Sequence, residues 1–451
     1  MAMKGVEMET AVSLAVADIT AEGVPNFGRE MRKYFQFDDD WINLNNGSFG
    51  SCPEPVTRVY QHFQHLSERR PDTFIRTNLP RLLAESRSAL AKLVNAPPAT
   101  VVFVPNATTA VNIVLRGLEW APGDKILYFD FIYGACGNTV LYVAESTAAS
   151  ALRVEVQLPI TDDALLSVFE ATITAAAGTV KLAVFDAIVS LPGVRLPFER
   201  LVAACKKHHI LSLVDAAHSV GQMPLDMQAL DADFFTSNCH KWLYAPRGCA
   251  FLYVPERNQS LIRSTLPTSW GFVPKTGGAV ISPLPQIEGD VGWAKMFTFV
   301  GTVDSSGYLS VPAAIAVRER LGGEQKIMQY TWDIARKGAE IFRQRLGTDI
   351  MPSYGAGEVA MFNIRLPLEL HEVEESLRGE VVTFLTDSLD AHGTYVAVYL
   401  YKGVFWTRVS GQVYLDEEDF VKGAEIMAGL VDMVKTGEWR SLEGKIKGLA
   451  V

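Results

Sequence analysis

Residues Phe234–Trp242 read FFTSNCHKW, and this stretch narrows the choice of fold more than any other part of the chain. It starts with two aromatic residues, as a buried strand would, and closes on the pair His240 and Lys241. A lysine among apolar and aromatic neighbours is expected to have a lowered pKa, because burial disfavours the charged amine. A neutral amine attacks carbonyl groups and can form a Schiff base. A single lysine is usually a solvated surface charge, so the interpretation of Lys241 depends on the residues that accompany it.

Short β-branched and aromatic runs alternate with helical stretches between residues 100 and 255. Several of these runs are apolar throughout, as expected of strands that helices cover on both faces. The alternation predicts an α/β fold with a mainly parallel sheet, in which ligands bind at the carboxyl ends of the strands. The predicted strands are Val101–Val104, Lys125–Phe129, Arg153–Gln157, Leu182–Phe185, Ile210–Val214, Phe234–Phe235 and Cys249–Val254.

Polar residues follow three of these strands, and each has an ordinary interpretation beside a functional one. Asn106–Thr109 opens a helix, which makes it either an anion site or a plain helix cap. Tyr133 would either stack on a planar ligand or pack in the core. Asp215 ends a buried strand, so its carboxylate needs a cap, an ion pair or a protonated ring nitrogen as partner.

Taken together, these residues match the needs of pyridoxal phosphate. The cofactor requires a lysine for its aldehyde, a carboxylate for its pyridine nitrogen, hydrogen-bond donors for its phosphate and an aromatic cover for its ring. Asp215 comes 26 residues before Lys241, with the hydroxyl-rich helix start and Tyr133 upstream. The sequence therefore indicates pyridoxal phosphate as cofactor.

The chain resembles the class V aminotransferase group of fold-type I pyridoxal phosphate enzymes over about residues 40 to 430. The closest subgroup looks like the isopenicillin N epimerase-like enzymes, which include fungal ergothioneine C–S lyases and a ring-closing enzyme of the loline pathway. The resemblance implies the fold-type I fold: a large domain with a mainly parallel seven-stranded sheet and a smaller C-terminal α/β domain. The matching motifs, in the same order, are Asn46–Gly50, Asn106–Thr109, Asp215–His218, Ser237–Trp242, Phe299–Asp304 and Arg408–Ser410.

The resemblance also implies a role for each residue around the cofactor ring. Lys241 would bind the cofactor covalently and then act as the base that moves the Cα proton of the substrate. Asp215 would pair with the pyridinium, His218 would hydrogen-bond the ring hydroxyl, and Tyr133 would stack on the ring.

The cofactor phosphate is expected to be bound by residues of two subunits. Thr302 would reach the phosphate of the neighbouring subunit, so the resemblance implies a homodimer with shared active sites. Within one chain, the residues that would hold the phosphate are Ala107, Thr108, Asn238 and His240.

The substrate side is implied by three further residues. Arg408 would hold the α-carboxylate of an amino acid, because a guanidinium pairs with a carboxylate through two hydrogen bonds. Asn46 and Ser48 would line the substrate pocket.

The sequence departs from the family pattern at three points. Asn238 stands where many members have serine, and Tyr133 stands where the stacking residue is often histidine. Cysteine desulfurases also need a persulfide-forming cysteine well after the lysine, but the last cysteine here is Cys249, eight residues past Lys241. A desulfurase is therefore disfavoured, and Cys136 and Cys52 are both interpreted as small buried residues.

The expected reaction is β-elimination from a cysteine conjugate or sulfoxide, that is, a C–S lyase that does not transaminate. Tyr133 and Tyr401 are candidates for protonating the leaving group. The alternative is a cyclase or epimerase of secondary metabolism that uses the same Cα carbanion. A nucleotide-binding enzyme is disfavoured because neither a G-x-G-x-x-G nor a G-x-x-x-x-G-K-[ST] pattern occurs at a strand end. A non-catalytic scaffold with this fold is disfavoured by the complete lysine, aspartate, histidine and arginine set.

Length, net charge and cysteine content limit the domain organisation, the partners and the location that the sequence allows. The 451 residues predict an N-terminal arm over residues 1–40, a large domain over 41–310 and a small domain over 311–451. The net charge of −10 and the lack of basic runs argue against nucleic acid or membrane partners. Five scattered cysteines without a C-x-x-C argue against a disulfide framework and a zinc site, and no metal is expected. The short apolar run Ala11–Ala17 follows Glu7 and Glu9 and lacks the basic start and the small-residue cleavage site of a signal peptide, so the expected location is the cytoplasm.

Overall fold

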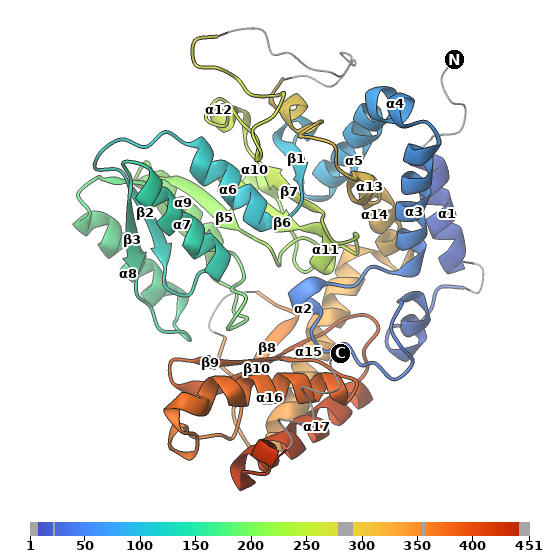
Figure 1. Cartoon of the computed structure of the whole chain (residues 1–451), viewed down its shortest axis with the longest axis vertical. Helices are drawn as coiled ribbons and strands as arrows, with labels where there is room; N and C mark the ends of the chain where they lie inside the picture. Colours follow the sequence, from blue (N-terminus) through green and yellow to red (C-terminus); the bar gives the residue numbers. More distant parts are fainter. Residues whose placement is uncertain (1–7, 21–22, 278–291, 354–356, 442–451) are drawn as a thin grey trace.

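A seven-stranded sheet forms the centre of the protein (Figure 1). The computed structural model describes residues 8–20, 23–277, 292–353 and 357–441. The strand order is β1-β7-β6-β5-β4-β2-β3, and the pairs β2–β3, β2–β4, β4–β5 and β5–β6 are parallel, whereas β7 is antiparallel to both of its neighbours. The mainly parallel sheet is therefore confirmed. The strands are β1 (Val101–Val104), β2 (Lys125–Phe129), β3 (Ser150–Val154), β4 (Val180–Asp186), β5 (Leu211–Asp215), β6 (Phe234–Asn238) and β7 (Ala250–Tyr253).

Helices cover both faces of this sheet, which explains why strands such as β1 are apolar throughout (Figure 1). On β1, Val101 and Phe103 belong to one hydrophobic core and Val102 and Val104 to the other. The second core includes residues of α6 and α7, and the first includes residues of α8 and α9. The bounds of these helices are α6 (Ala107–Gly117), α7 (Gly134–Ser146), α8 (Asp162–Ala175) and α9 (Phe198–Lys207).

A smaller antiparallel sheet follows in the C-terminal part of the chain, with the order β8-β10-β9. In chain order, this part consists of β8 (Met361–Arg365), α16 (Arg378–Ala391), β9 (Ala397–Tyr401), β10 (Val404–Ser410) and α17 (Glu417–Thr436), so it contains the expected mixture of helices and strands. The long helix α15 (Gly323–Leu346) contacts both this sheet and α17. The proposed domain boundaries stay a prediction.

The predicted N-terminal arm contains a helix that the sequence did not indicate, α1 (Met8–Thr20). Its buried residues Ala11, Ala15 and Ile19 recur every four residues and face α3 (Glu54–Arg69) and α14 (Val311–Arg320). Two of these three residues are alanines, so the apolar stripe is narrow and gives a weak periodic signal.

Residues 54–93 form a series of helical segments rather than one helix. It consists of α3, α4 (Pro71–Thr73), a π-helical turn at Phe74–Asn78 and α5 (Leu79–Leu93). Pro71 ends α3, because proline has no N–H to continue the helical ladder. The remaining short elements are α2 (Asn46–Phe49), α10 (Met227–Leu230), α11 (Cys239–Trp242), α12 (Glu256–Gln259), α13 (Ser306–Leu309) and 3₁₀ turns at Arg29–Tyr34, Pro98–Thr100, Gly292–Phe297, Leu370–Glu372 and Glu375–Leu377.

The segment over residues 256–302 contains α12 and one 3₁₀ turn, and its residues 278–291 lie outside the described residues. The β9–β10 hairpin of the small sheet contacts residues that follow two strands of the large sheet. Lys402 Nζ pairs with Asp130 at 2.9 Å, and Tyr401 Oη accepts a hydrogen bond from the Leu158 N–H at 3.0 Å.

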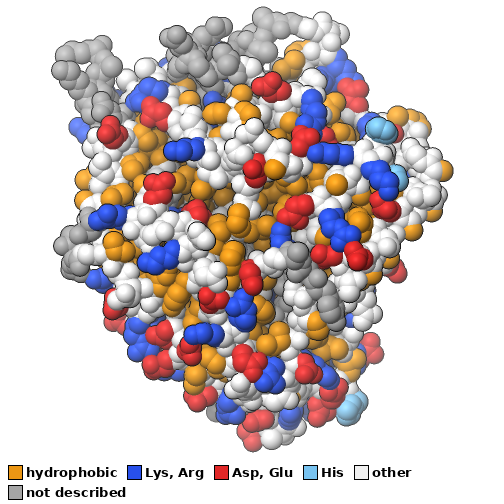
Figure 2. Space-filling model, turned by 180° about the vertical axis from the view of Figure 1, so that it is seen from behind, with side chains coloured by type: hydrophobic (Ala, Val, Ile, Leu, Met, Phe, Trp, Pro, Cys, Tyr) orange, Lys and Arg blue, Asp and Glu red, His pale blue; other side chains and the backbone are white. Residues whose placement is uncertain are grey.

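Charged side chains of both signs alternate on the face shown in Figure 2, with hydrophobic side chains gathered between them. Lys and Arg side chains are interspersed with Asp and Glu and form no large basic patch on that face. Within the described ranges, no helix is long and apolar enough to cross a membrane.

Candidate active site

The site begins where three neighbouring strands end. Asp186 ends β4, Asp215 ends β5 and Asn238 ends β6, and these strands are adjacent and parallel in the sheet. Helix α11 starts directly after β6 and carries Lys241. The sheet therefore brings the predicted residues Asp215, Asn238 and Lys241 to one edge.

Lys241 is half-buried, and its Nζ lies 3.3 Å from Nε2 of His218. Burial and then the positive charge of Arg408 lower the pKa of this lysine to about 8, while Asp215 and Asp186 act in the opposite direction. Roughly a tenth of the amine is therefore neutral at pH 7, far more than for an ordinary lysine, and the neutral amine is the form that attacks a carbonyl.

His218 is buried, and burial lowers its pKa well below 6.5, with the charge of Lys241 as the next cause. The ring is therefore neutral. Trp242 Nε1–H donates to His218 Nδ1 at 3.5 Å, which leaves the ring proton on Nε2. His218 thus presents a fixed N–H donor beside Lys241, as a partner of the cofactor's ring hydroxyl would.

Asp215 is only 2% exposed and accepts hydrogen bonds from Cys136 Sγ and from the Ala217 N–H, both at 3.1 Å. Across the described residues it forms no ion pair within 4.0 Å. Burial raises its pKa, while the two hydrogen bonds and Lys241 favour the charged form. A protonated ring nitrogen would supply the missing positive charge, so this carboxylate fits the pyridine end of the cofactor.

Cys136 has more contacts than the sequence indicated. It is buried as expected, but its thiol also donates to the carboxylate of Asp215. In the sequence, the position of Cys136 three residues after Tyr133, at the start of α7, was the indication that it lies near the site. Tyr133 itself is 47% exposed, so its ring is open to a ligand or to another chain.

The residues predicted to hold the phosphate meet at the start of α6. The Ala107 N–H donates to Asn238 Oδ1 at 3.0 Å, and Asn106 caps the helix by accepting from the Thr109 N–H at 2.8 Å. Thr108 is half-buried in the same first turn. The cap interpretation is therefore confirmed, whereas the anion site stays a prediction that rests on the preference of helix N-termini for negative charge.

His240, the fourth residue predicted to hold the phosphate, lies on α11. Its Nδ1–H donates to the Cys249 carbonyl at 3.1 Å, which directs Nε2 away from the backbone. Burial lowers the pKa of His240 to about 4 in the protein alone. A phosphate beside Nε2 would raise that pKa, because an opposite charge favours the protonated ring.

Arg408 lies on β10, is 1% exposed, and bonds only to neutral groups. It donates to the Ser190 carbonyl at 2.6 Å, to Asn45 Oδ1 at 2.8 Å and to Ser48 Oγ at 3.1 Å, while its Nε has no partner. It forms no ion pair within 4.0 Å in the part of the chain that the structure describes. Burial lowers its pKa to about 10. A buried cation without an anion fits the predicted site for a substrate carboxylate.

Asn46 and Ser48 are placed differently from one another. Ser48 contacts Arg408, on the expected substrate side. Asn46 is fully buried and donates to the Lys241 carbonyl at 3.0 Å, so it holds α2 against α11. Gly50 permits this approach, because a Cβ at that position would lie 1.8 Å from the His240 carbonyl oxygen. The Arg408 partners Asn45 and Ser190 were not predicted.

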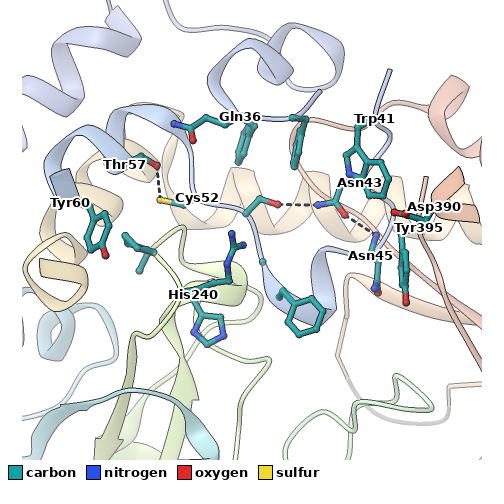
Figure 3. Close-up of a pocket in the computed structure, with 18 residues that line it drawn as sticks. Gln36, Trp41, Asn43, Asn45, Cys52, Thr57, Tyr60, His240, Asp390 and Tyr395 are labelled. Atoms are coloured by element: carbon teal, nitrogen blue, oxygen red, sulfur yellow. Dashed lines mark hydrogen bonds between the residues drawn. The ribbon is translucent and has the colours of Figure 1, made fainter. Parts of the chain in front are cut away.

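A cavity of about 690 Å³ lies next to this segment and is lined by His240, Asn45, Arg247 and Cys52, among others (Figure 3). In Figure 3, His240 and Asn45 reach it from different elements. Lys241, Asp215 and His218 do not line it. The cavity therefore borders the site beside His240, one of the predicted phosphate-binding residues, and beside Asn45. It does not include Lys241.

Thr302 is exposed and lines another cavity, of about 330 Å³, together with Pro105 and Thr109. Lys241, Asp215 and His218 do not line that cavity either. Val303 beside it is 66% exposed. The exposure of this loop is compatible with contact to a second chain.

The pKa of Lys241 gives a prediction for cofactor capture. Because only the neutral amine reacts, covalent capture of pyridoxal phosphate by cofactor-free protein should rise with pH and reach half its maximum near pH 8. Mass spectrometry after borohydride reduction at each pH measures the captured fraction at Lys241. A midpoint near the ordinary lysine value of 10.5 would contradict the account of the site.

Comparisons with known proteins agree with this arrangement. Residues 51–273 match the family model for aminotransferase class V. The chain is 36% identical to the L-cysteine desulfhydrase-like protein lolT2 of Epichloe uncinata over 89% of its own length and 93% of the relative. It is 32% identical to the hercynylcysteine sulfoxide lyase of Schizosaccharomyces pombe, over 89% and 97%.

Two more distant matches complete the comparison. The chain is 30% identical to the isopenicillin N epimerase of Amycolatopsis lactamdurans over 74% of its length and 84% of the relative. Among solved structures, the cystine C–S lyase C-DES with cysteine persulfide superimposes with a TM-score of 0.70 at 22% identity, covering 87% of this chain and 98% of that one. The latter match supports the fold.

Proposed function

Because the chain belongs to the class V aminotransferase family and uses pyridoxal phosphate, we propose that it is a C–S lyase that cleaves a cysteine conjugate or its sulfoxide. The reaction is a β-elimination from an L-amino acid. The released enamine reacts with water to give pyruvate and ammonia, and the sulfur leaves with the remainder of the substrate.

Each group of the site has a task in this proposal. Arg408 holds the substrate α-carboxylate with a charge that no described carboxylate neutralises. Asp215 keeps a proton on the ring nitrogen, and His218 donates its Nε2–H to the ring hydroxyl. Bound pyridoxal phosphate supplies an electron sink that stabilises negative charge at the substrate Cα.

Lys241 moves the proton. Its lowered pKa allows the neutral amine to take the Cα proton at neutral pH, with His218 beside it to fix its position. Departure of the sulfur from Cβ then follows from the negative charge at Cα. Tyr133, with 47% of its surface exposed, and Tyr401, whose Oη accepts a hydrogen bond from Leu158 and keeps its own proton, are the candidates for protonating the leaving group.

The similarity to a hercynylcysteine sulfoxide lyase and an L-cysteine desulfhydrase-like protein over 89% of the chain is the main support for C–S cleavage. The cysteines support it as well. Cys136, Cys205, Cys239 and Cys249 are buried, and only Cys52 is half-buried, so no exposed thiol follows Lys241 to carry a persulfide. This disfavours a desulfurase.

A cyclase or epimerase remains the second candidate, because the chain also resembles an isopenicillin N epimerase. It would use the same Lys241 and Arg408 but keep the substrate carbon skeleton intact. The two candidates differ in whether a bond to sulfur breaks.

A pyruvate assay tests the proposed function. Protein loaded with pyridoxal phosphate is incubated with L-cysteine, an S-alkyl cysteine and its sulfoxide, and pyruvate is measured with lactate dehydrogenase. We expect pyruvate from at least one of the sulfur substrates and none from L-serine used as a control. Pyruvate from none of them, together with consumption of another amino acid, would contradict the lyase assignment.

We further propose that the active protein is a homodimer in which Thr302 reaches the phosphate site of the partner. Its exposed loop and the neighbouring exposed Val303 support this. Thr302→Ala should then weaken retention of pyridoxal phosphate about tenfold, the effect of losing one hydrogen bond to a charged group.

Mixed dimers test the sharing of the site directly. Co-expressed Lys241→Ala and Thr302→Ala chains should form one intact site per mixed dimer, with cofactor retention as tight as in the wild type. If every site in the purified mixed dimer is defective, Thr302 acts within its own chain and the shared site is wrong.

The proposed place of action is the cytoplasm. All five cysteines are unpaired, as expected in a reducing compartment. The proposed partners are an amino-acid substrate and a second copy of the chain, without nucleic acid or membrane.

A further inference from the structure

Asp186 is a second buried carboxyl group beside Asp215, and the tasks assigned above do not use it. The two residues end adjacent strands and are direct partners in the parallel register of β4 and β5. Neighbouring strands lie about 4.8 Å apart, and register partners point to the same face of the sheet. Asp186 is 3% exposed and Asp215 is 2% exposed. The fold therefore places two carboxyl groups side by side, away from water.

The two carboxyl groups differ in their hydrogen bonds. Asp215 accepts from the Cys136 thiol and from the Ala217 N–H. The Oδ2 atom of Asp186 is buried without a hydrogen-bond partner. Within the described ranges, neither carboxyl forms an ion pair within 4.0 Å. An unpartnered charge is strongly disfavoured in such surroundings, whereas a carboxylic acid is tolerated.

The pair and the groups around it come from four elements, β4, β5, α7 and α11. Asp186 faces Asp215 on β5, Lys241 on α11 and the backbone N–H of Tyr133 at the start of α7, and the Cys136 thiol on α7 faces Asp215. Burial and then the charge of Asp215 raise the pKa of Asp186 well above its usual range, while the Tyr133 N–H and Lys241 lower it only in part. The thiol, the Ala217 N–H and Lys241 favour the ionised form of Asp215.

We propose that Asp186 stays a neutral carboxylic acid and thereby confines the negative charge of the pair to Asp215, the partner of the cofactor's ring nitrogen. Asp186 is then a positioning residue that acts through Asp215. Two neighbouring buried carboxyl groups share one proton because both cannot ionise at low cost. The unequal hydrogen bonds decide which one keeps it. The inference rests on the role proposed for Asp215 and is independent of the leaving group.

Infrared spectroscopy of the full chain saturated with pyridoxal phosphate tests the protonation state. Protein carrying ¹³C-labelled aspartate should show a carboxylic-acid carbonyl band that shifts with the label at neutral pH. Asp186→Asn should abolish this band and Asp215→Asn should retain it. Asp163→Asn, at a carboxylate whose side chain is 87% exposed, is the control and should leave the band unchanged. A band lost in Asp215→Asn but kept in Asp186→Asn, or no band in the wild type, would overturn the inference.

The visible absorbance of the bound cofactor gives a second readout. Asparagine is neutral, as a carboxylic acid is, so Asp186→Asn should keep the wild-type absorbance spectrum at neutral pH, whereas Asp215→Asn removes the negative charge beside the ring nitrogen and should shift the spectrum. A spectrum that shifts in Asp186→Asn as it does in Asp215→Asn would contradict the proposal, because Asp186 would then carry the charge of the pair. Neither readout depends on pyruvate formation, so failure of this inference and failure of the lyase assignment are distinguishable.

Discussion

Lys241→Ala should abolish both covalent retention of pyridoxal phosphate and formation of pyruvate. The lysine is the only one placed beside His218 and Asp215 in the described site, and its lowered pKa suits it for reaction with a carbonyl and for proton transfer. Loss of a positioned base lowers kcat by about 10²- to 10⁴-fold, and loss of the covalent link adds to this. Dialysis followed by visible absorbance measures cofactor retention, and the pyruvate assay measures kcat.

Two controls separate chemistry from folding. Lys207→Ala removes a lysine that pairs with Glu170 at the surface, so it should keep the absorbance and the activity of the wild type. Because Lys241 is held at the end of the sheet by α11, its replacement by alanine should leave the far-ultraviolet circular dichroism unchanged. Retention of the cofactor band after dialysis of Lys241→Ala would show that another residue binds the cofactor.

Arg408→Ala should have the second largest effect, expressed mainly in KM for substrates with an α-carboxylate. Truncating one partner of a buried, hydrogen-bonded charge pair costs about 2–5 kcal/mol, which corresponds to a fall in kcat/KM of roughly 30- to several thousand-fold. Cofactor absorbance should persist, because Arg408 bonds to Ser190, Asn45 and Ser48 rather than to the predicted cofactor residues.

A second consequence follows for Lys241. The charge of Arg408 lowers the pKa of that lysine, so Arg408→Ala should move the midpoint of cofactor capture to higher pH. Arg200→Ala, which removes a surface partner of Asp163, should change neither KM nor the midpoint. If KM and the midpoint of Arg408→Ala equal those of the wild type, the carboxylate site lies elsewhere.

The strands of the large sheet were predictable because both of their faces are buried. Val101–Val104 and Lys125–Phe129 form continuous apolar runs, which are recognisable without any long-range information. The strand predicted at Arg153–Gln157 lies three residues earlier, at Ser150–Val154, because this edge strand is only partly buried and its pattern is weak. Helix α1 was missed for a related reason, since Ala11 and Ala15 contribute little to an apolar stripe.

The site was predictable as far as residues share a local motif. Lys241, His240 and Asn238 stand within four positions, and Asp215 and His218 lie on the strand end before them. The partners of Arg408 were not predictable in this way, because Asn45 is 363 residues distant in the chain. Asp186 and Cys136 become visible only when the register of β4 and β5 and the packing of α7 are known. The individual roles of these residues stay predictions.

The central claim is that Lys241 drives cleavage of a carbon–sulfur bond, and the fate of the substrate β carbon tests it most directly. Carbon NMR can follow an S-conjugate of L-cysteine, or its sulfoxide, labelled with ¹³C at Cβ and incubated with the loaded protein. We predict that the label appears in the methyl group of pyruvate with the wild type and stays in the substrate with Lys241→Ala. A label that remains bonded to an amino-acid skeleton, whether cyclised or inverted at Cα, would contradict the account.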